Sequence, residues 1–227
     1  MCREPIVLKP IRSDLHYRGL YDEIAFELLT TPAPLYRSLL NHLGPFGATT
    51  QSLKFESPSI SDSNATCTLA DLNAAIRIRL ERMEIDFWKL HEISADTANQ
   101  IVQGAWKAII DTRSVGMTSQ VVELNVVTEI QGASYSALMK RYVMIPEALG
   151  PVDAGVAFYA RPVPEGEAWS NVVLDRIFGQ DGQLVVKMTM GMPSTKVGLD
   201  QLAVAVTETI NTTFHNLGLE FPLEVGQ

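Results

Sequence analysis

An alternation of apolar and polar residues through Gly116–Ile130 constrains the fold more than any other feature of this sequence. A period of two residues is typical of a β-strand with one face buried and the other exposed. We interpret this strand as the start of the second copy of one structural unit, because similar elements follow it in the same order as in the first half of the chain. The apolar residues that share one face are Val122, Leu124, Val126 and Ile130.

Each copy is expected to contain a strand, a short helix, three strands and a long helix, that is, β-α-β-β-β-α. The sequence predicts an irregular N-terminal arm over residues 1–19, a first repeat over 20–115 and a second over 116–227. In the first repeat we expect strands at Tyr21–Leu29, Thr50–Glu56, Ala65–Leu72 and Ala75–Leu90, with a β-bulge near Arg82, and helices at Leu35–Leu43 and Ser94–Thr112. In the second we expect strands at Val121–Ile130, Val156–Pro162, Asn171–Phe178 and Leu184–Met190, and helices at Tyr135–Val143 and Leu199–Leu217.

The predicted fold class is therefore α+β, with antiparallel strands covered by two long helices. A sheet with one apolar face must bury that face, and one helix per copy covers only part of it. We expect one compact pseudo-twofold unit, with the copies sharing a sheet or packing face to face. The alternative is two separate lobes, but the short connection at residues 113–116 has no features of a flexible linker. The helix residues expected in the core are Ile101, Ala105, Trp106, Ile109, Val206, Ile210 and Phe214.

This duplicated order is similar in topology to the saddle of the TATA-binding protein and, more loosely, to sliding clamps and helix-grip ligand binders. The resemblance concerns the order of elements alone, since no motif residue of those families occurs in the sequence. It implies neither a family nor DNA binding.

Composition narrows the classes of partner. The formal net charge is −8, with 18 Lys and Arg scattered among 26 Asp and Glu, which disfavours nucleic acid. Cys2 and Cys67 lack the spacing of a zinc site, and the scan for metal, cofactor and nucleotide motifs finds none. We therefore expect no cofactor and no metal. The sequence contains no membrane span and no signal-peptide run near its start, so we expect a cytoplasmic protein.

The densest group of side chains that could exchange protons lies between Asp14 and Glu23. His16, with Asp14 and Glu23, is the best candidate for a catalytic cluster. The alternative is a solvated arm whose charges face water, because the sequence fixes no third group to orient His16.

The predicted hairpin Val172–Met192 holds the candidate ligand site. A loop of Gln180, Asp181 and Gly182 would place Asp175 opposite Lys187 and turn Arg176 onto the apolar face. A buried guanidinium needs an anionic partner, which could be a protein carboxylate or the acidic head of a ligand lying along Met188 and Met190. The alternatives are that Arg176 reaches water at the sheet margin and that the methionines belong to the core.

The sequence leaves three classes of function open. The first is a non-catalytic binding or adaptor protein that uses its sheet face or edges for a protein partner or a second copy of itself. The second is a carrier of a small apolar or amphipathic acid in a Met-lined cavity between the sheet and the long helices. The third is an enzyme of hydrolase or cyclase type that works through His16, which ranks last because no strong catalytic motif is found.

Overall fold

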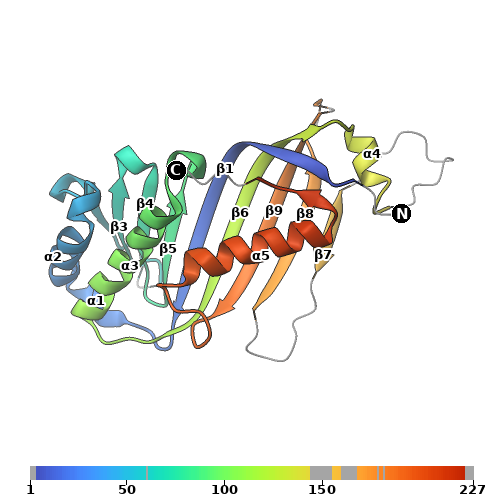
Figure 1. Cartoon of the computed structure of the whole chain (residues 1–227). Helices are drawn as coiled ribbons and strands as arrows, with labels where there is room; N and C mark the ends of the chain where they lie inside the picture. The colour runs from blue at the N-terminus through green and yellow to red at the C-terminus, as the bar shows by residue number, and fades with distance from the viewer. Residues whose placement is uncertain are drawn as a thin grey trace.

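The chain folds as an α+β protein built on one ten-stranded sheet (Figure 1). The computed structural model describes residues 4–59, 61–143, 155–159, 168–177, 179, 180 and 182–222. The strands in these residues are β1 (Ile6–Tyr21), β2 (Leu53–Glu56), β3 (Asn64–Leu69), β4 (Ala74–Ile78), β5 (Arg82–Phe87), β6 (Met117–Gln131), β7 (Val156–Tyr159), β8 (Trp169–Arg176), β9 (Gln183–Pro193) and β10 (Leu219–Glu220). The α-helices are α1 (Phe26–Thr30), α2 (Pro32–Leu43), α3 (Ala95–Thr112), α4 (Tyr135–Met139) and α5 (Leu202–Asn216).

The strand order is β2-β3-β4-β5-β1-β6-β9-β8-β7, with β10 added beside β1. All neighbours on this path pair antiparallel, whereas β10 pairs parallel with the first residues of β1. The two longest strands, β1 and β6, lie side by side in the middle. The centre of the sheet therefore joins the N-terminal half of the chain to the C-terminal half.

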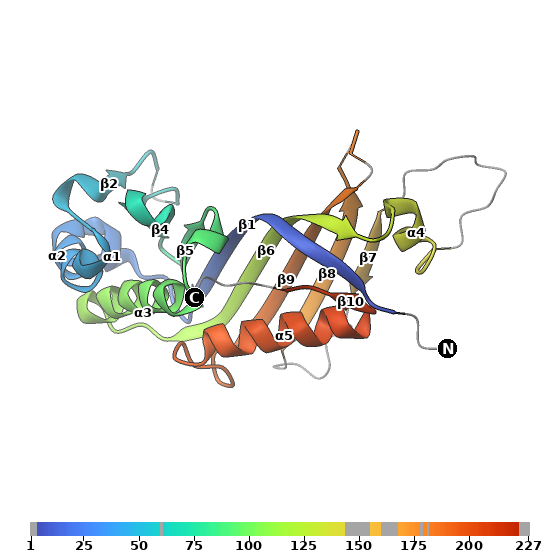
Figure 2. The same cartoon turned by 45° about the horizontal axis from the view of Figure 1, so that its top comes forward.

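Helices α3 and α5 lie on the same side of the sheet, and α5 crosses β6, β9 and β8 (Figures 1 and 2). Helices α1, α2 and α4 lie at its two ends, with α2 packed against α3. The core lies between the sheet and α3 and α5, where Tyr17 and Leu124 are buried. In the described part of the chain no helix covers the opposite face, which we call the open face.

Strand β1 corrects the prediction of an irregular N-terminal arm. It is an amphipathic strand. Ser13 and Tyr17 lie on its buried side, whereas His16 and Arg18, of the other parity, lie on the side that is only half-buried. Pro10 is accommodated where the pairing with β6 shifts register between Pro10 and Arg12, as expected for proline at a bulge. The predicted strand Tyr21–Leu29 is also wrong: β1 ends at Tyr21, and Phe26–Thr30 forms α1.

The predicted single strand Ala75–Leu90 is in fact the hairpin β4–β5. Ile76 pairs with Ile85 and Ile78 with Met83, so apolar residues of even number face apolar residues of odd number across the turn. The change of phase that suggested a bulge near Arg82 is what a tight reversal of the chain produces. The turn is closed by the Arg79 amide, which donates to the Arg82 carbonyl at 2.9 Å.

The hairpin β8–β9 keeps the predicted faces but not the predicted register. Arg176 pairs with Leu184 and Asp175 with Val185, two residues away from the expected partners Val186 and Lys187. The connection is longer than expected, and its left-handed glycine is Gly179, with φ of 81°, in place of Gly182. A shift of two residues preserves parity, so Arg176 does share a face with buried Leu174. The expected pairing of Phe178 lies outside the described residues.

Of the two predicted long helices, α3 has the expected bounds and α5 does not. Helix α3 begins after the Ser94 cap, whose hydroxyl accepts from the Thr97 amide, and ends at Thr112 as expected. Helix α5 is shorter than the predicted Leu199–Leu217. Of the expected core residues, Ile101, Ala105, Ile109, Ile210 and Phe214 are buried, whereas Trp106 and Val206 are only partly buried. Among the described residues, no helix has the length and hydropathy to span a membrane.

Candidate functional site

The open face carries a group of charged residues from three neighbouring strands. On β1, Arg18 pairs with Glu84 of β5, and Glu84 pairs in turn with Arg77 of β4. Side chains that are directly paired across strands point to the same face. The register therefore gathers on the open face charges that are far apart in the sequence.

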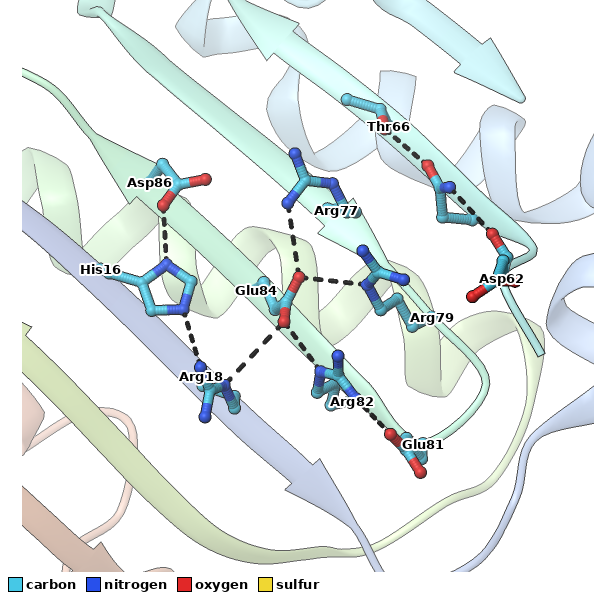
Figure 3. A network of polar contacts seen from close by, with 11 residues as sticks. His16, Arg18, Asp62, Thr66, Arg77, Arg79, Glu81, Arg82, Glu84 and Asp86 are labelled. Carbon is cyan, nitrogen blue, oxygen red and sulfur yellow. Dashed lines mark hydrogen bonds and ion pairs between the residues drawn. The ribbon is translucent and has the colours of Figure 1, made fainter. Parts of the chain in front are cut away.

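Four arginines surround the one carboxylate of Glu84 (Figure 3). One carboxylate oxygen, Oε1, accepts from Arg82 Nε at 2.8 Å and lies 3.9 Å from Arg18 Nε. The other, Oε2, accepts from Arg79 Nε at 3.2 Å and from Arg77 Nη1 at 3.4 Å. We call Arg18, Arg77, Arg79 and Arg82 the arginine cluster.

Glu84 is held in its ionised form by this cluster. Its side chain is only 8% exposed. Burial opposes ionisation and is the largest single influence, but the hydrogen bonds and charges of Arg82 and then Arg79 together outweigh it, and the pKa of Glu84 falls to about 2. The carboxylate thus serves as an internal counter-ion that allows the guanidinium groups to approach one another.

Positive charge remains in the cluster after these pairings. Its four guanidinium groups share two carboxylates, Glu84 and Glu81, the latter paired with Arg82 alone. The cluster side chains are between 26% and 37% exposed, so they can still reach a ligand. Arg18 Nε is buried, and no hydrogen-bond acceptor among the described residues reaches it. The arrangement can accept an anion, since guanidinium groups bind carboxylates through paired N–H donors.

The cluster continues across the open face into aromatic residues. Arg18 pairs with Val121, Val121 with Gly191, and Gly191 with Trp169 at the far side of the sheet. The Trp169 ring lies over Gly191, and a Cβ at that position would come within 2.1 Å of the indole nitrogen, so a larger residue there would displace the ring. The next row of cross-strand pairs includes Tyr159, the last residue of β7, whose side chain is 71% exposed.

The structure separates the predicted catalytic residues. His16 Nδ1 donates to Asp86 at 2.6 Å, and His16 Nε2 accepts from Arg18 at 3.4 Å. Asp14 accepts from the Lys89 amide and pairs with Arg12. Glu23 lies beyond the end of β1 and pairs with Arg113 at 3.1 Å. A histidine paired with a carboxylate can act as a base, but its free nitrogen here already faces Arg18.

The predicted ligand-binding residues lie elsewhere in the sheet. The Arg176 guanidinium lies over the Tyr135 ring, 6.0 Å from its centroid, which is an aromatic partner for the cation. Met188 and Met190 are fully buried on the helix side and pair with Leu124 and Val122. A ligand role for these residues and an enzymatic role for His16 both stay predictions.

Sequence reasoning missed the residues that define the arginine cluster. The signal was present in residues 76–87, IRIRLERMEIDF, where charged residues alternate with apolar ones. A single strand over these residues does not place Arg77 opposite Glu84, whereas the hairpin does. An irregular N-terminal arm gives Arg18 no strand partner, whereas β1 pairs it with Glu84 and Val121.

No protein-family model matches the sequence, and no curated protein matches it. Within the described residues, no three His, Cys, Asp or Glu side chains are grouped so that they could hold a metal ion.

Proposed function

We propose that this protein is a non-catalytic binding or adaptor protein, which holds an acidic segment of a protein partner on the open face of its sheet. The observation that carries the proposal is the arginine cluster, in which four guanidinium groups surround a single buried carboxylate. A carboxylate from the partner would receive the remaining N–H donors. It would also offset the repulsion between the arginines that Glu84 offsets only in part.

The composition of the open face favours a protein partner. Arginine, tryptophan and tyrosine are the residues that most often dominate the energetics of protein–protein interfaces, and the open face presents the arginine cluster, Trp169 and Tyr159. The chain as a whole carries a formal charge of −8, which repels a long polyanion such as nucleic acid at a distance. A short acidic segment can meet the cluster without approaching the rest of the surface.

Binding of a fluorescein-labelled oligoglutamate peptide, followed by fluorescence anisotropy, tests this proposal. The double variant Arg77→Gln/Arg79→Gln should bind at least about tenfold more weakly, because each charge-assisted hydrogen bond contributes about 1.5–3 kcal/mol. Binding should also weaken at about 1 M salt, where the Debye length is about 3 Å. The variant Glu84→Gln removes the internal counter-ion and should bind the peptide more tightly than the wild type.

The matched control is Arg37→Gln, since Arg37 is an exposed arginine on α2, away from the open face. It should leave the affinity unchanged. Equal binding by the wild type and the double variant would refute the role of the cluster. Tighter binding of a single-stranded DNA oligonucleotide than of oligoglutamate would assign the open face to nucleic acid instead.

We also infer that the chain is a tandem repeat with a pseudo-twofold relation between β1 and β6. The strand order supports this, because β5, β4 and β3 follow β1 on one side and β9, β8 and β7 follow β6 on the other. Each half ends in a helix on the same side of the sheet, α3 or α5. With β1 included, the first repeat would begin near Ile6 and not at residue 20, while the boundary near residue 116 is unchanged.

A further inference from the structure

The terminal nitrogens of the arginine cluster reach solvent, because most of its contacts with Glu84 use Nε. Arg79 and Arg82 donate through Nε to the Glu84 carboxylate at 3.2 and 2.8 Å, and Arg77 donates through Nη1 at 3.4 Å. Both Nη groups of Arg79 and the Nη2 group of Arg77 have no hydrogen-bond partner among the described residues (Figure 3). They are not among the buried atoms that lack a partner, so water has access to them.

The cluster carries an excess of two positive charges. Its four guanidinium groups are balanced by the buried Glu84 and by Glu81, which pairs with Arg82. Asp86, the next residue of β5 on the same face, is engaged separately by His16 Nδ1 at 2.6 Å. A ligand that neutralises the cluster therefore brings two negative charges to one place.

A phosphoryl group meets this requirement better than a carboxylate does. All four guanidinium groups have a nitrogen within 3.9 Å of the Glu84 carboxylate, so they lie close enough together to share a second anion. A carboxylate supplies one negative charge and two acceptor oxygens. A phosphorylated side chain supplies about 1.5 to 2 negative charges at pH 7 and three acceptor oxygens. Guanidinium groups bind phosphate through paired N–H donors, as they bind carboxylates.

We propose that the partner segment on the open face carries a phosphorylated side chain, whose phosphoryl group binds to the arginine cluster. This inference rests on the proposed function, since it names the residue that the acidic segment brings to the cluster. Arg77 and Arg79 donate their free Nη groups to the phosphoryl oxygens. Glu84 remains the internal counter-ion, since it is only 8% exposed and both of its oxygens are already bonded. Phosphorylation of the partner thus switches its binding on.

The charge of the whole chain favours a protein as the source of the phosphoryl group. Its formal net charge of −8 opposes the approach of extended polyanionic surfaces, such as nucleic acid or an anionic membrane. A single phosphorylated residue meets the cluster without bringing further negative charge near the rest of the surface.

Four peptides that differ at one position test the proposal. In an uncharged Gly/Ala background, that position holds phosphoserine, cysteic acid, glutamate or serine. Cysteic acid is the control for shape, because its sulfonate has three terminal oxygens but one negative charge. Binding is measured by fluorescence anisotropy at about pH 7.5, where phosphoserine, with a second pKa of about 6, is a dianion. We expect the phosphoserine peptide to bind the wild type at least about tenfold more tightly than the other three.

The double variant Arg77→Gln/Arg79→Gln should lose this preference, whereas Arg37→Gln, on α2, should keep it. The four peptides are compared on the wild-type protein, so the main test does not depend on the folding of any variant. Binding of oligoglutamate is measured separately. If oligoglutamate binds through the cluster but the phosphoserine and glutamate peptides bind equally, this inference fails and the proposed function stands.

Other outcomes would also overturn the inference. Equal affinity for the phosphoserine and cysteic acid peptides would show that the second charge is not recognised. Binding of none of the four peptides would remove the phosphorylated partner altogether. Displacement of the phosphoserine peptide by an equimolar amount of inorganic phosphate would assign the cluster to a free anion, and displacement by vesicles that contain phosphatidylinositol bisphosphate would assign it to a membrane.

Discussion

At the scale of single residues, Glu84 couples the stability of the fold to pH. Its pKa is lowered from an ordinary 4.5 to about 2, although burial alone would raise it, because Arg82 and Arg79 stabilise the charged form. Since the folded-state pKa lies below the unfolded value, the contribution of Glu84 is fully present above about pH 4.5 and is lost as the pH falls toward 2.

The expected result is a free energy of unfolding, measured in urea, that falls by roughly 3 kcal/mol more in the wild type than in Glu84→Gln between about pH 6 and pH 2. The control Glu208→Gln removes an exposed carboxylate of α5 and should keep the wild-type profile. Parallel profiles for the wild type and Glu84→Gln would show that the arginines do not hold this carboxylate.

Helix α3 offers a second test with a control on the next residue. Ile109 is fully buried, whereas its neighbour Ile110 is 42% exposed. Ile109→Ala should lower the free energy of unfolding by about 2–5 kcal/mol, and Ile110→Ala by less than about 1 kcal/mol. Ile210→Ala, at a buried position of α5, should resemble Ile109→Ala. A loss under about 1 kcal/mol for Ile109→Ala in denaturant titration would mean that the helix presents a different face.

At the scale of secondary-structure elements, β1 differs most from the sequence-based prediction, which was an irregular arm. It is bonded on both sides, to β5 and to β6. Amides in a central strand open to solvent only through large-scale unfolding. In hydrogen exchange we expect Leu15, Tyr17 and Arg18 to be among the slowest-exchanging amides, comparable with those of β6. Exchange of these amides as fast as that of the exposed Thr30–Thr31 segment would mean that β1 is an arm after all.

The sequence predicted elements well where one periodicity runs without interruption, as in β6 and α3. It failed where local pattern competes with tertiary pairing. The polar residues of β1 signal a loop when read alone, and only their partners on β5 and β6 make them the exposed side of a strand. Likewise, the alternation in residues 76–87 does not distinguish a bulge from a reversal, because both change the phase of the apolar residues.

The candidate site was less predictable than the fold for the same reason. The arginine cluster requires the register of three strands, so an error in any one of them hides it. Arg77 and Arg82 are separated by a turn that the sequence did not reveal, and Arg18 lies far from both in the chain.

At the scale of the whole molecule, the fold divides its two faces between different kinds of contact. One face of the sheet is covered by α3 and α5 and forms the core, and the other presents the arginine cluster, Trp169 and Tyr159. The second face is the proposed binding surface. We also expect the two halves of the chain to superpose about β1 and β6. Peptide binding does not test that expectation.

The most direct measurement is a map of where an acidic peptide binds. In an NMR titration of the ¹⁵N-labelled protein with oligoglutamate, we predict shifts at the side-chain groups of Arg18, Arg79 and Arg82 and at the Trp169 indole, with α3 and α5 unaffected. The shifts should vanish at about 1 M salt, where charge interactions are screened. Shifts confined to the helices or to α4, or none in the arginine cluster, would contradict the claim that this protein recognises its partner through the open face of its sheet.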